Sequence, residues 1–249
     1  MGVNAQTTVP KFTAGQVLTA AQQTGINTGI PVFATTTTRD AAFGGSNKVL
    51  AEGQYAYIEA SNTTQYYDGA AWQTLGGGLT YLTSATFTTA TSVSLPNSTF
   101  TSTYRNYRFI LSLTALTADA DFTLRFRASG TDDSTNNYQL AMNDVRTTGT
   151  SALATASSGT SMSLAEQDAG LATRYSLVLD ILAPQLALPT IVFGNIQFVD
   201  KAATYTASRT GSGFFSATTQ FDSLTFISSV ASSISGNYRV YGYADSLGA

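Results

Sequence analysis

The sequence predicts an all-β protein made of two β-rich parts, and three observations support this prediction. Apolar and polar residues alternate in several segments, as in strands with one buried face; clear examples are 107–113, 122–127 and 175–181. Clusters of Gly, Ser, Asn and Asp separate such segments, for example in 129–137 and 208–213. No segment of helical period exceeds a few turns. We expect a small N-terminal β-meander module with a short helical arm, then an antiparallel, jelly-roll-like β-sandwich.

Residues 1–30 are expected to form a docking arm with one short helix. Thr19 and Gln22 have the spacing of a capping box, and Gly25 can end the helical turn. The segment offers no core of its own, so it is either a frayed terminus or an arm that docks on another protein. We expect no signal peptide, because no basic region followed by an apolar run opens the sequence.

Residues 31–75 predict a small β-meander for anchoring or oligomerisation. Tyr55 and Tyr57 share one face of a predicted strand, and Asp68-Gly69 signals a tight turn before Trp72. Fewer than about fifty residues bury little apolar surface alone. The aromatic residues therefore either make a mini-core around Trp72 or belong to a core that several copies share. The candidate oligomerisation residues are Tyr55, Tyr57, Tyr67 and Trp72.

Gly76–Gly78 predict a hinge, because three glycines in a row leave the backbone permissive. Residues 79–249 are expected to form a displayed β-sandwich of six to eight strands joined by long polar loops. The loops are expected at 129–137, 146–161 and 208–213. The predicted inward faces are Tyr107/Phe109/Leu111/Leu113, Phe122/Leu124/Phe126 and Tyr175/Leu177/Leu179/Ile181.

Charge and composition exclude several classes of function. Charged residues make up 11% of the chain, against roughly 25% in an average protein, and the net charge is -3 without any Lys/Arg cluster. Binding of nucleic acid through phosphate neutralisation is therefore not expected. Cys and His are absent, which excludes disulfides, Cys nucleophiles, Ser-His-Asp triads and the usual zinc sites. The most apolar stretch, 177–193, contains Asp180, Pro184 and Pro189, so we expect no membrane insertion.

Paired carboxylates are the one arrangement here that suits catalysis without histidine. Glycoside hydrolysis needs two of them, and Asp119/Asp121 and Asp132/Asp133 are close in sequence. None of these paired acids lies in an apolar stretch that would tune its pKa, so we expect turn acids, no enzyme, no metal and no cofactor. A glycan depolymerase that uses Asp132 and Asp133 is the enzymatic alternative.

Aromatic residues beside polar loops are the better candidates for ligand binding. Tyr138 follows the loop 129–137, and Phe214 and Phe215 follow a Gly/Ser segment. They could stack on a sugar, contact another subunit or pack inside the fold. The candidate ligand or interface residues are Asp132, Asp133, Asn136, Tyr138, Phe214 and Phe215.

Three parts of the sequence resemble structural proteins of tailed bacteriophages. The segment VPKFTAGQVLTAAQ is similar to a leader of phage minor tail and fibre proteins. The small module resembles the β-module that often follows this leader, and YRNYRFILSLTAL and FDSLTFISSVASSISGNYRVYGY resemble sandwich domains of phage appendages. The matching residues are Phe12, Ala14, Gly15, Leu18, Thr19, Ala20, Arg39, Asp40, Glu52, Gly53, Tyr57, Tyr67, Asp68, Gly69 and Trp72.

The resemblance implies a virion protein that is assembled in the cytoplasm of the host bacterium. It implies a homotrimer, anchored to other virion proteins by its N-terminal part and presenting the sandwich outward as a short tail fibre or fibre-like protein. The outer loops are then candidates for binding host-surface carbohydrate. A head-decoration protein that contacts capsid subunits without a ligand is the alternative, because the chain has no triple-stranded shaft of a long fibre.

Overall fold

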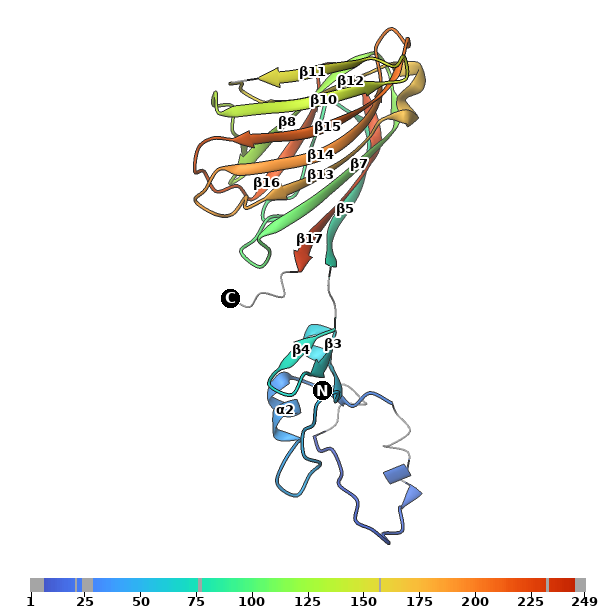
Figure 1. Ribbon diagram of the computed structural model, residues 1–249, viewed down its shortest axis with the longest axis vertical. Coiled ribbons are helices and arrows are strands. Elements are labelled where there is room, and N and C mark those ends of the chain that lie inside the picture. Colours follow the sequence, from blue (N-terminus) through green and yellow to red (C-terminus); the bar gives the residue numbers. More distant parts are fainter. Residues whose placement is uncertain are drawn as a thin grey trace. The chain divides into compact units, whose positions relative to one another are not determined.

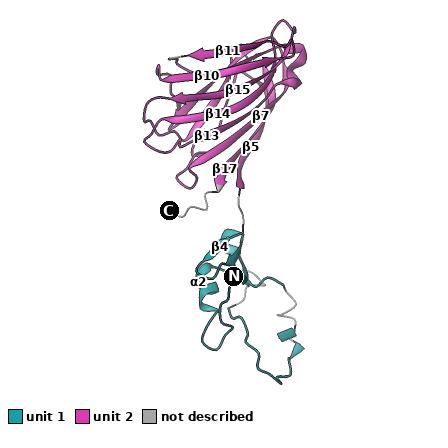
Figure 2. Cartoon of the chain, in the orientation of Figure 1, with its two compact units in different colours: residues 1–77 teal, residues 78–249 magenta. Residues whose placement is uncertain are grey.

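Figure 1 shows a computed structural model of the chain, whose residues form two compact units, 1–77 and 78–249 (Figure 2). The structure describes residues 7–20, 22–23, 29–75, 78–156, 158–231 and 233–244. Both units are built on β-sheets, which confirms the predicted all-β fold. Two glycines of the predicted hinge, Gly76 and Gly77, lie outside the described residues, and Gly78 is the first residue of strand β5.

The first unit contains a four-stranded sheet in the order β1-β2-β3-β4. Strands β2, β3 and β4 are antiparallel neighbours and form a meander, and β1 adds in parallel beside β2. A 3-10 turn, η1, joins β2 to β3. The bounds are β1 Val32–Phe33, β2 Tyr55–Ile58, η1 Glu59–Ser61, β3 Thr63–Tyr67 and β4 Trp72–Thr74.

A short helix, α2 (Thr36–Ala41), was not expected from the sequence. Threonine has low helix propensity, and this helix begins within a run of four threonines. The helix begins because Thr35 and Thr38 form a reciprocal capping box, in which the Thr38 hydroxyl takes the place of the usual Glu or Gln. The capping signal is therefore present in the sequence, in an uncommon form.

The core of the first unit is small and includes a residue of the predicted arm. Val9 is buried, its N–H donates to the Ala42 carbonyl at 3.1 Å, and its own carbonyl accepts from Lys48 at 2.9 Å. Val9 therefore belongs to this unit rather than to a separate arm. The buried core residues are Val9, Phe33, Ala42, Ala56 and Ile58.

The predicted capping box at Thr19 is present. The Gln22 N–H donates to the Thr19 hydroxyl at 3.3 Å, and the Gln22 side chain accepts from the Thr19 N–H at 2.9 Å. Gly25, which was expected to end this turn, lies outside the described residues.

The second unit is a sandwich of two antiparallel sheets. The large sheet has the order β11-β10-β15-β14-β13-β7-β17-β5, and the small sheet has the order β12-β8-β16-β6, with β9 beside β8. A 3-10 segment, η2, precedes β13. The bounds are β5 Gly78–Ala90, β6 Ser92–Ser94, β7 Asn106–Leu116, β8 Ala120–Ala128, β9 Thr131–Asp132, β10 Tyr138–Arg146, β11 Ser151–Ala156, β12 Met162–Gln167, η2 Ala169–Arg174, β13 Ser176–Leu182, β14 Thr190–Val199, β15 Thr206–Phe215, β16 Ser223–Ser228 and β17 Ile234–Ala244.

Most connections carry the chain from one sheet to the other. It passes between the layers from β5 to β6, β6 to β7, β7 to β8, β9 to β10, β11 to β12, β12 to β13, β15 to β16 and β16 to β17. Such alternation between layers is the jelly-roll feature of this sandwich. The connections β10–β11 and β13–β14–β15 do not alternate between the layers, because they are hairpins within the large sheet (Figure 1).

The core lies between the two sheets and confirms the predicted inward faces. Every residue of the three predicted faces is buried, because side chains alternate along each strand and one set points to the other layer. Aromatic rings join the layers: the Phe122 ring of the small sheet lies 4.7 Å from Tyr175, which precedes β13 of the large sheet, and 5.0 Å from Phe226 of the neighbouring strand β16, between ring centroids.

Two segments that were expected to be loops are strands. Residues 208–213 lie within β15, and the segment 146–161 contains β11. A Cβ atom at Gly213 would lie 2.7 Å from the Met162 Cε, so this glycine lets the two sheets pack closely. The described part of the sandwich therefore has thirteen strands, more than the six to eight expected.

Candidate functional site

The first candidate surface is an aromatic group around Trp72. The Trp72 ring lies 5.7 Å from both the Tyr67 and the Phe43 ring centroids, and the Arg39 guanidinium lies 4.5 Å over it. Trp72 and Tyr67 are only half-buried and Phe43 packs against the small core. The group therefore covers one side of the small core and leaves aromatic surface exposed. Its association with other copies stays a prediction.

The Asp68-Gly69 turn places Tyr67 directly opposite Trp72 in the β3–β4 register. The Asp68 carboxylate accepts from the Ala71 N–H at 2.7 Å and from the Ala70 N–H at 2.9 Å. These two bonds, the first being the stronger, lower the pKa of Asp68. Gly69 has a φ of +97°, which a side chain would strain, so the predicted tight turn has its physical basis here.

Tyr55 and Tyr57 share the outward face of β2. Ala56 and Ile58 point into the small core, whereas Tyr55 is exposed and Tyr57 is half-buried. The Tyr57 hydroxyl donates to the Asn62 side chain at 3.0 Å. The two tyrosines therefore add little to the core of their own unit and present aromatic surface outward.

In the sandwich, Asp132 and Asp133 are bound to their own loop and strands. Asp132 pairs with Arg127 at 2.9 Å and accepts from the Thr225 hydroxyl at 2.7 Å. Asp133 accepts from the Thr135 N–H at 2.8 Å. Asn136 is exposed. These contacts are those of structural turn acids and leave Asn136 as the accessible residue of this predicted site.

Tyr138 is not a loop residue open to ligands. It is the first residue of β10 and only 1% exposed, because its side chain points between the sheets. Its hydroxyl donates to the Asp133 carbonyl and accepts from the Phe126 N–H, both at 2.9 Å. Tyr138 therefore fastens the loop 129–137 to β8.

Phe214 and Phe215 lie on opposite faces of β15, because successive side chains of a strand alternate. Phe215 is fully buried against Tyr138 and Phe221, with ring centroids 5.0 and 4.9 Å away, which corrects its prediction as a ligand or interface residue. Phe214 is 38% exposed on the outer face of the large sheet. Only Phe214 of the pair is available to a partner.

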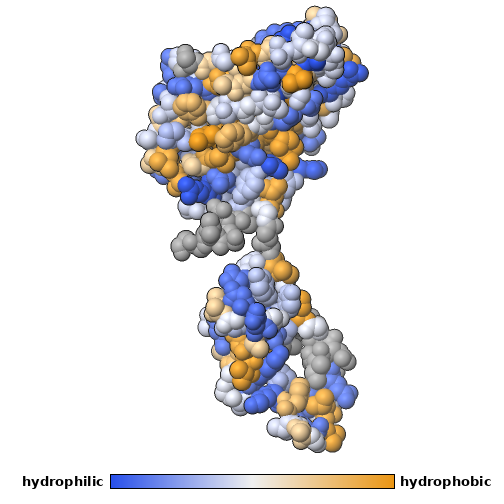
Figure 3. Space-filling view, viewed as in Figure 1, coloured by the Kyte–Doolittle hydropathy of each residue, from blue (hydrophilic) through white to orange (hydrophobic). Residues whose placement is uncertain are grey.

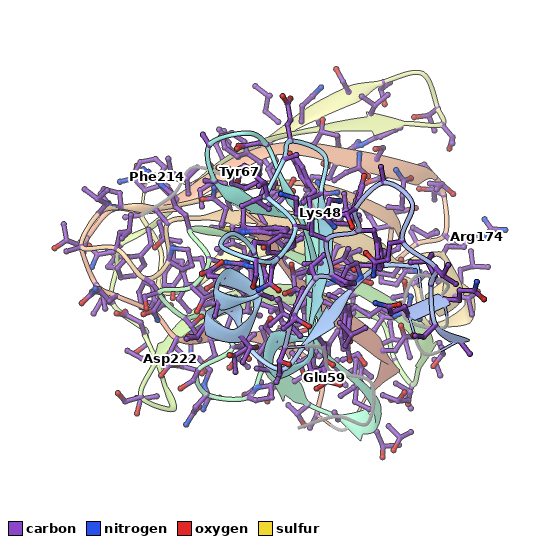
Figure 4. All side chains as sticks on the ribbon, turned by 90° about the horizontal axis from the view of Figure 1, so that it is seen from below. Lys48, Glu59, Tyr67, Arg174, Phe214 and Asp222 are labelled. Atoms are coloured by element: carbon purple, nitrogen blue, oxygen red, sulfur yellow. The ribbon has the colours of Figure 1, made fainter. Side chains whose placement is uncertain are left out.

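The predicted ligand residues lie near the ends of the large-sheet strands, on the side where β5 begins. Gly78 begins β5 on this side, Tyr138 begins β10 there, and Phe215 ends β15 opposite Tyr138. Figure 4 shows Phe214 and Asp222 on one side of the sandwich and Arg174 on the other. The loops 117–119, 147–150 and 200–205 and segment η2 lie at the opposite ends of the strands.

A polar group that the sequence did not reveal lies on the outer face of the large sheet. Asp180 accepts from the Arg108 Nε and Nη2, both at 2.7 Å, and from the Tyr243 hydroxyl. The bonds from Arg108 hold the pKa of Asp180 below its usual 3.8, while burial raises the pKa of Tyr243 to about 12. Directly opposite positions in the register bring Asp180 and Arg108 together, a pairing that only the fold determines.

Replacing Asp180 by Asn is expected to reduce stability at neutral pH and to change how it responds to acid. Because the pKa of Asp180 is lower in the folded state, its ionised carboxylate stabilises the folded protein above pH 3.8. This contribution disappears as the pH falls through the folded-state pKa. The difference in free energy of unfolding between the native chain and Asp180→Asn should thus be constant near neutrality and shrink below pH 3.8. Urea unfolding across this pH range measures it. Tyr243→Phe, which keeps the Arg108 pair, should retain most of the pH dependence; a pH-independent difference for Asp180→Asn would contradict the assignment.

One acid has an environment that the sequence analysis did not anticipate. Burial raises the pKa of Glu166, which lies opposite Asp121 in the register of β12 and β8. Asp121 is itself paired with Lys201 at 2.6 Å.

Three surface hollows measure about 290, 160 and 220 Å³, and Glu166 and Asp121 do not line them.

Comparison with known proteins finds no matching protein family, no similar curated protein and no similar solved structure. Within the described ranges, no helix has the length and apolar character to cross a membrane. Those residues also contain no group of three or more acidic side chains placed to hold a metal ion.

Proposed function

We propose that the chain is a non-enzymatic structural subunit of a bacteriophage particle. It acts as a homotrimeric appendage, a short tail fibre or fibre-like protein, anchored to other virion proteins through its N-terminal unit. The sandwich is the presented part and a candidate receptor for host-surface carbohydrate. The resemblance of residues 9–22 and of the small module to phage proteins motivates this proposal.

The observation that carries the proposal is the difference between the two units. The sandwich has a large continuous core, whereas the described residues of the first unit include only five buried hydrophobic residues, and Tyr55, Tyr57, Tyr67 and Trp72 stay partly accessible. A unit with so small a core gains stability when its aromatic surface is covered by another copy or by another protein. This division suits a particle subunit in which one unit attaches and the other is presented.

A site for carbohydrate is expected at the edge of the sandwich opposite the chain entry. The residues first considered, Asp132, Asp133, Tyr138 and Phe215, are engaged in internal contacts, and they lie near the entry edge. The loops at the other ends of the strands, 117–119, 147–150 and 200–205, are the candidates that remain. This refines the location of the proposed receptor surface and leaves the proposed role unchanged.

The full chain is expected to have three times the 26.1 kDa mass of one chain in solution. Analytical ultracentrifugation measures this mass for the native chain, for Trp72→Ala and for the fragment 78–249, which contains the complete sandwich core. If the aromatic group holds copies together, Trp72→Ala should reduce the affinity between copies more than it reduces the thermal stability of the sandwich. The melting transition of the fragment is the control for sandwich stability.

Each outcome of this measurement distinguishes among roles. A trimeric native chain with weakened association in Trp72→Ala supports the proposal. An unchanged mass and melting transition in Trp72→Ala would show that the aromatic group is not a subunit contact. A native chain of single-chain mass would contradict the homotrimer and favour the head-decoration role, in which assembly needs the particle itself.

A further inference from the structure

We propose that the outer face of the large sheet is a contact surface between copies of this chain. This inference rests on the proposed function and deepens it by naming the partner of the sandwich, a second copy. The outer face means here the outward positions of β7, β13, β14, β15 and β10, which are hydrogen-bonded neighbours in the sheet. In Figure 3, apolar and neutral side chains gather on the face of the sandwich that is turned to the viewer.

Exposed apolar side chains are concentrated on this sheet. The register places Leu182, Ile191 and Phe214 side by side across three strands, with Phe193 next to Ile191 on the same face. Ile191, Phe193 and Phe214 are 38–46% exposed. In the described part of the sandwich, the exposed large hydrophobic residues all lie on the outward positions of the large sheet or on the loop between β13 and β14: Leu79, Tyr81, Val145, Leu153, Val178, Leu186, Leu188, Ile191, Phe193 and Phe214.

Short stretches of β13 and β14 have the pattern of strands covered on both faces. In β13 the outward Val178 and Leu182 are apolar like the inward Leu177 and Leu179, and in β14 residues 191–193 are all apolar, whereas the outward Asp180, Asn195 and Gln197 are polar. A half-exposed antiparallel strand alternates apolar and polar residues, whereas strands buried on both faces are near-continuously apolar. Strand β8 of the small sheet alternates in the ordinary way, with Arg125 and Arg127 outward.

The charges differ between the two outer faces of the sandwich. The outward positions of β8 carry Asp121, Arg125 and Arg127. On the outer face of the large sheet, the charged pair Arg108–Asp180 is internally satisfied, and Tyr243 supplies a further hydrogen bond. Covering this face would leave no uncompensated ion, and the hydrogen bonds of the pair would offset part of the desolvation penalty of the two charges.

The size and neutrality of the outer face fit a second copy of the same chain. Strands lie about 4.8 Å apart and rise about 3.3 Å per residue, so five strands over about seven residues cover roughly 550 Å². This face and an equal area of the copy that covers it together remove about 1,100 Å², above the roughly 1,000 Å² of a specific interface. In a closed ring of three copies the contacts are heterologous, so this face of each copy packs against a different surface of the next copy. A nucleic acid would instead need a basic face.

The test is Ile191→Asp in the full chain, with Thr123→Asp as the matched control. Ile191 lies at the centre of the apolar row, and Thr123 lies on the outward side of β8, paired with Ser163 in β12. Burying an unpaired carboxylate between copies should raise the apparent dissociation constant at least about 100-fold. The control should change it less than about threefold. Sedimentation over a range of concentrations gives the mass, and circular dichroism verifies the fold of each variant.

A second measurement uses the absence of cysteine from the sequence. Phe193→Cys and Thr123→Cys each provide a single thiol whose reaction with a maleimide can be timed. The thiol at position 193 should react at least about tenfold more slowly at concentrations where the chain is trimeric than after dilution, because a second copy covers it. The thiol at position 123 should react at the same rate before and after dilution.

The outcomes separate this inference from the proposed function. A trimer that survives Ile191→Asp, with an equally reactive thiol at 193 at all concentrations, overturns the inference and leaves the trimer to the Trp72 group. A native chain that is monomeric throughout overturns both the inference and the homotrimer, and assigns the outer face to a protein of different sequence. Dissociation in Ile191→Asp alone, with protection at 193, supports the inference.

Discussion

Replacing Asp144 by Asn is expected to lower the free energy of unfolding of the sandwich by about 3–5 kcal/mol. Asp144 in β10 lies opposite Arg209 in β15, and both side chains point between the sheets. Arg209 Nε and Nη2 donate to the two carboxylate oxygens at 2.6 and 2.8 Å, and Nη1 donates to the Leu164 carbonyl. Asp144 is 3% exposed, so removal of its charge leaves a guanidinium buried without its counter-ion.

Equilibrium unfolding in urea, followed by circular dichroism, measures this loss. Asp121→Asn is the control, because Asp121 and its partner Lys201 have side chains 57% and 37% exposed, and such a pair contributes about 0–1 kcal/mol. The double replacement Asp144→Leu with Arg209→Met should recover most of the loss, since apolar residues of similar size substitute for a buried ion pair. An Asp144→Asn variant as stable as Asp121→Asn would refute this account.

Phe215→Ala is expected to cost about 3–5 kcal/mol of stability, because it opens a cavity in the core. The Phe215 ring contacts the rings of Tyr138 and Phe221 and points at Phe126, so these neighbours would lose packing on one side. The surrounding strands hold the space open, which prevents relaxation from recovering the lost contacts. Thermal or urea unfolding of the fragment 78–249 measures the effect.

Phe214→Ala is the matched control, since it removes the same side chain from the adjacent position on the other face of β15. Its direct effect on the folded subunit should be below about 1 kcal/mol, because the ring is partly solvated already. Both variants should be compared at several protein concentrations, because only a contribution from subunit association changes with dilution. Equal costs for the two phenylalanines at high dilution would contradict the assigned orientations.

Local patterns in the sequence were sufficient to predict which face of several strands is buried. Period-two alternation identified the inward residues of β7, β8 and β13, since side-chain direction along a strand depends only on neighbouring residues. The Asp68-Gly69 turn and the Thr19 capping box were predictable for the same reason. The segment 208–213 was misread because its glycines serve close packing and not a turn: Gly213 lies against Met162 of the other sheet, and Gly211 lies against Ala141 and Met142 of the neighbouring strand.

The candidate site was harder to predict, because its residues are brought together by pairing between distant strands. Asp144 falls in phase with the buried Leu140 and Met142, a signal for a buried charge, yet its partner Arg209 lies sixty-five residues away. Tyr138 and Phe215 were expected in loops, and their burial follows from the register of β10 with β15.

The sequence by itself determined the all-β character, the absence of Cys and His chemistry, and which side of several strands points inward. These properties depend on composition and on contacts between near neighbours along the chain. Only the tertiary structure decided which strands are adjacent, and with it the Arg209–Asp144 pair, the separation of Phe214 from Phe215 and the apolar outer face of the large sheet. A surface shared by five strands exists only after residues far apart in sequence have paired, because each strand contributes only a few of its side chains.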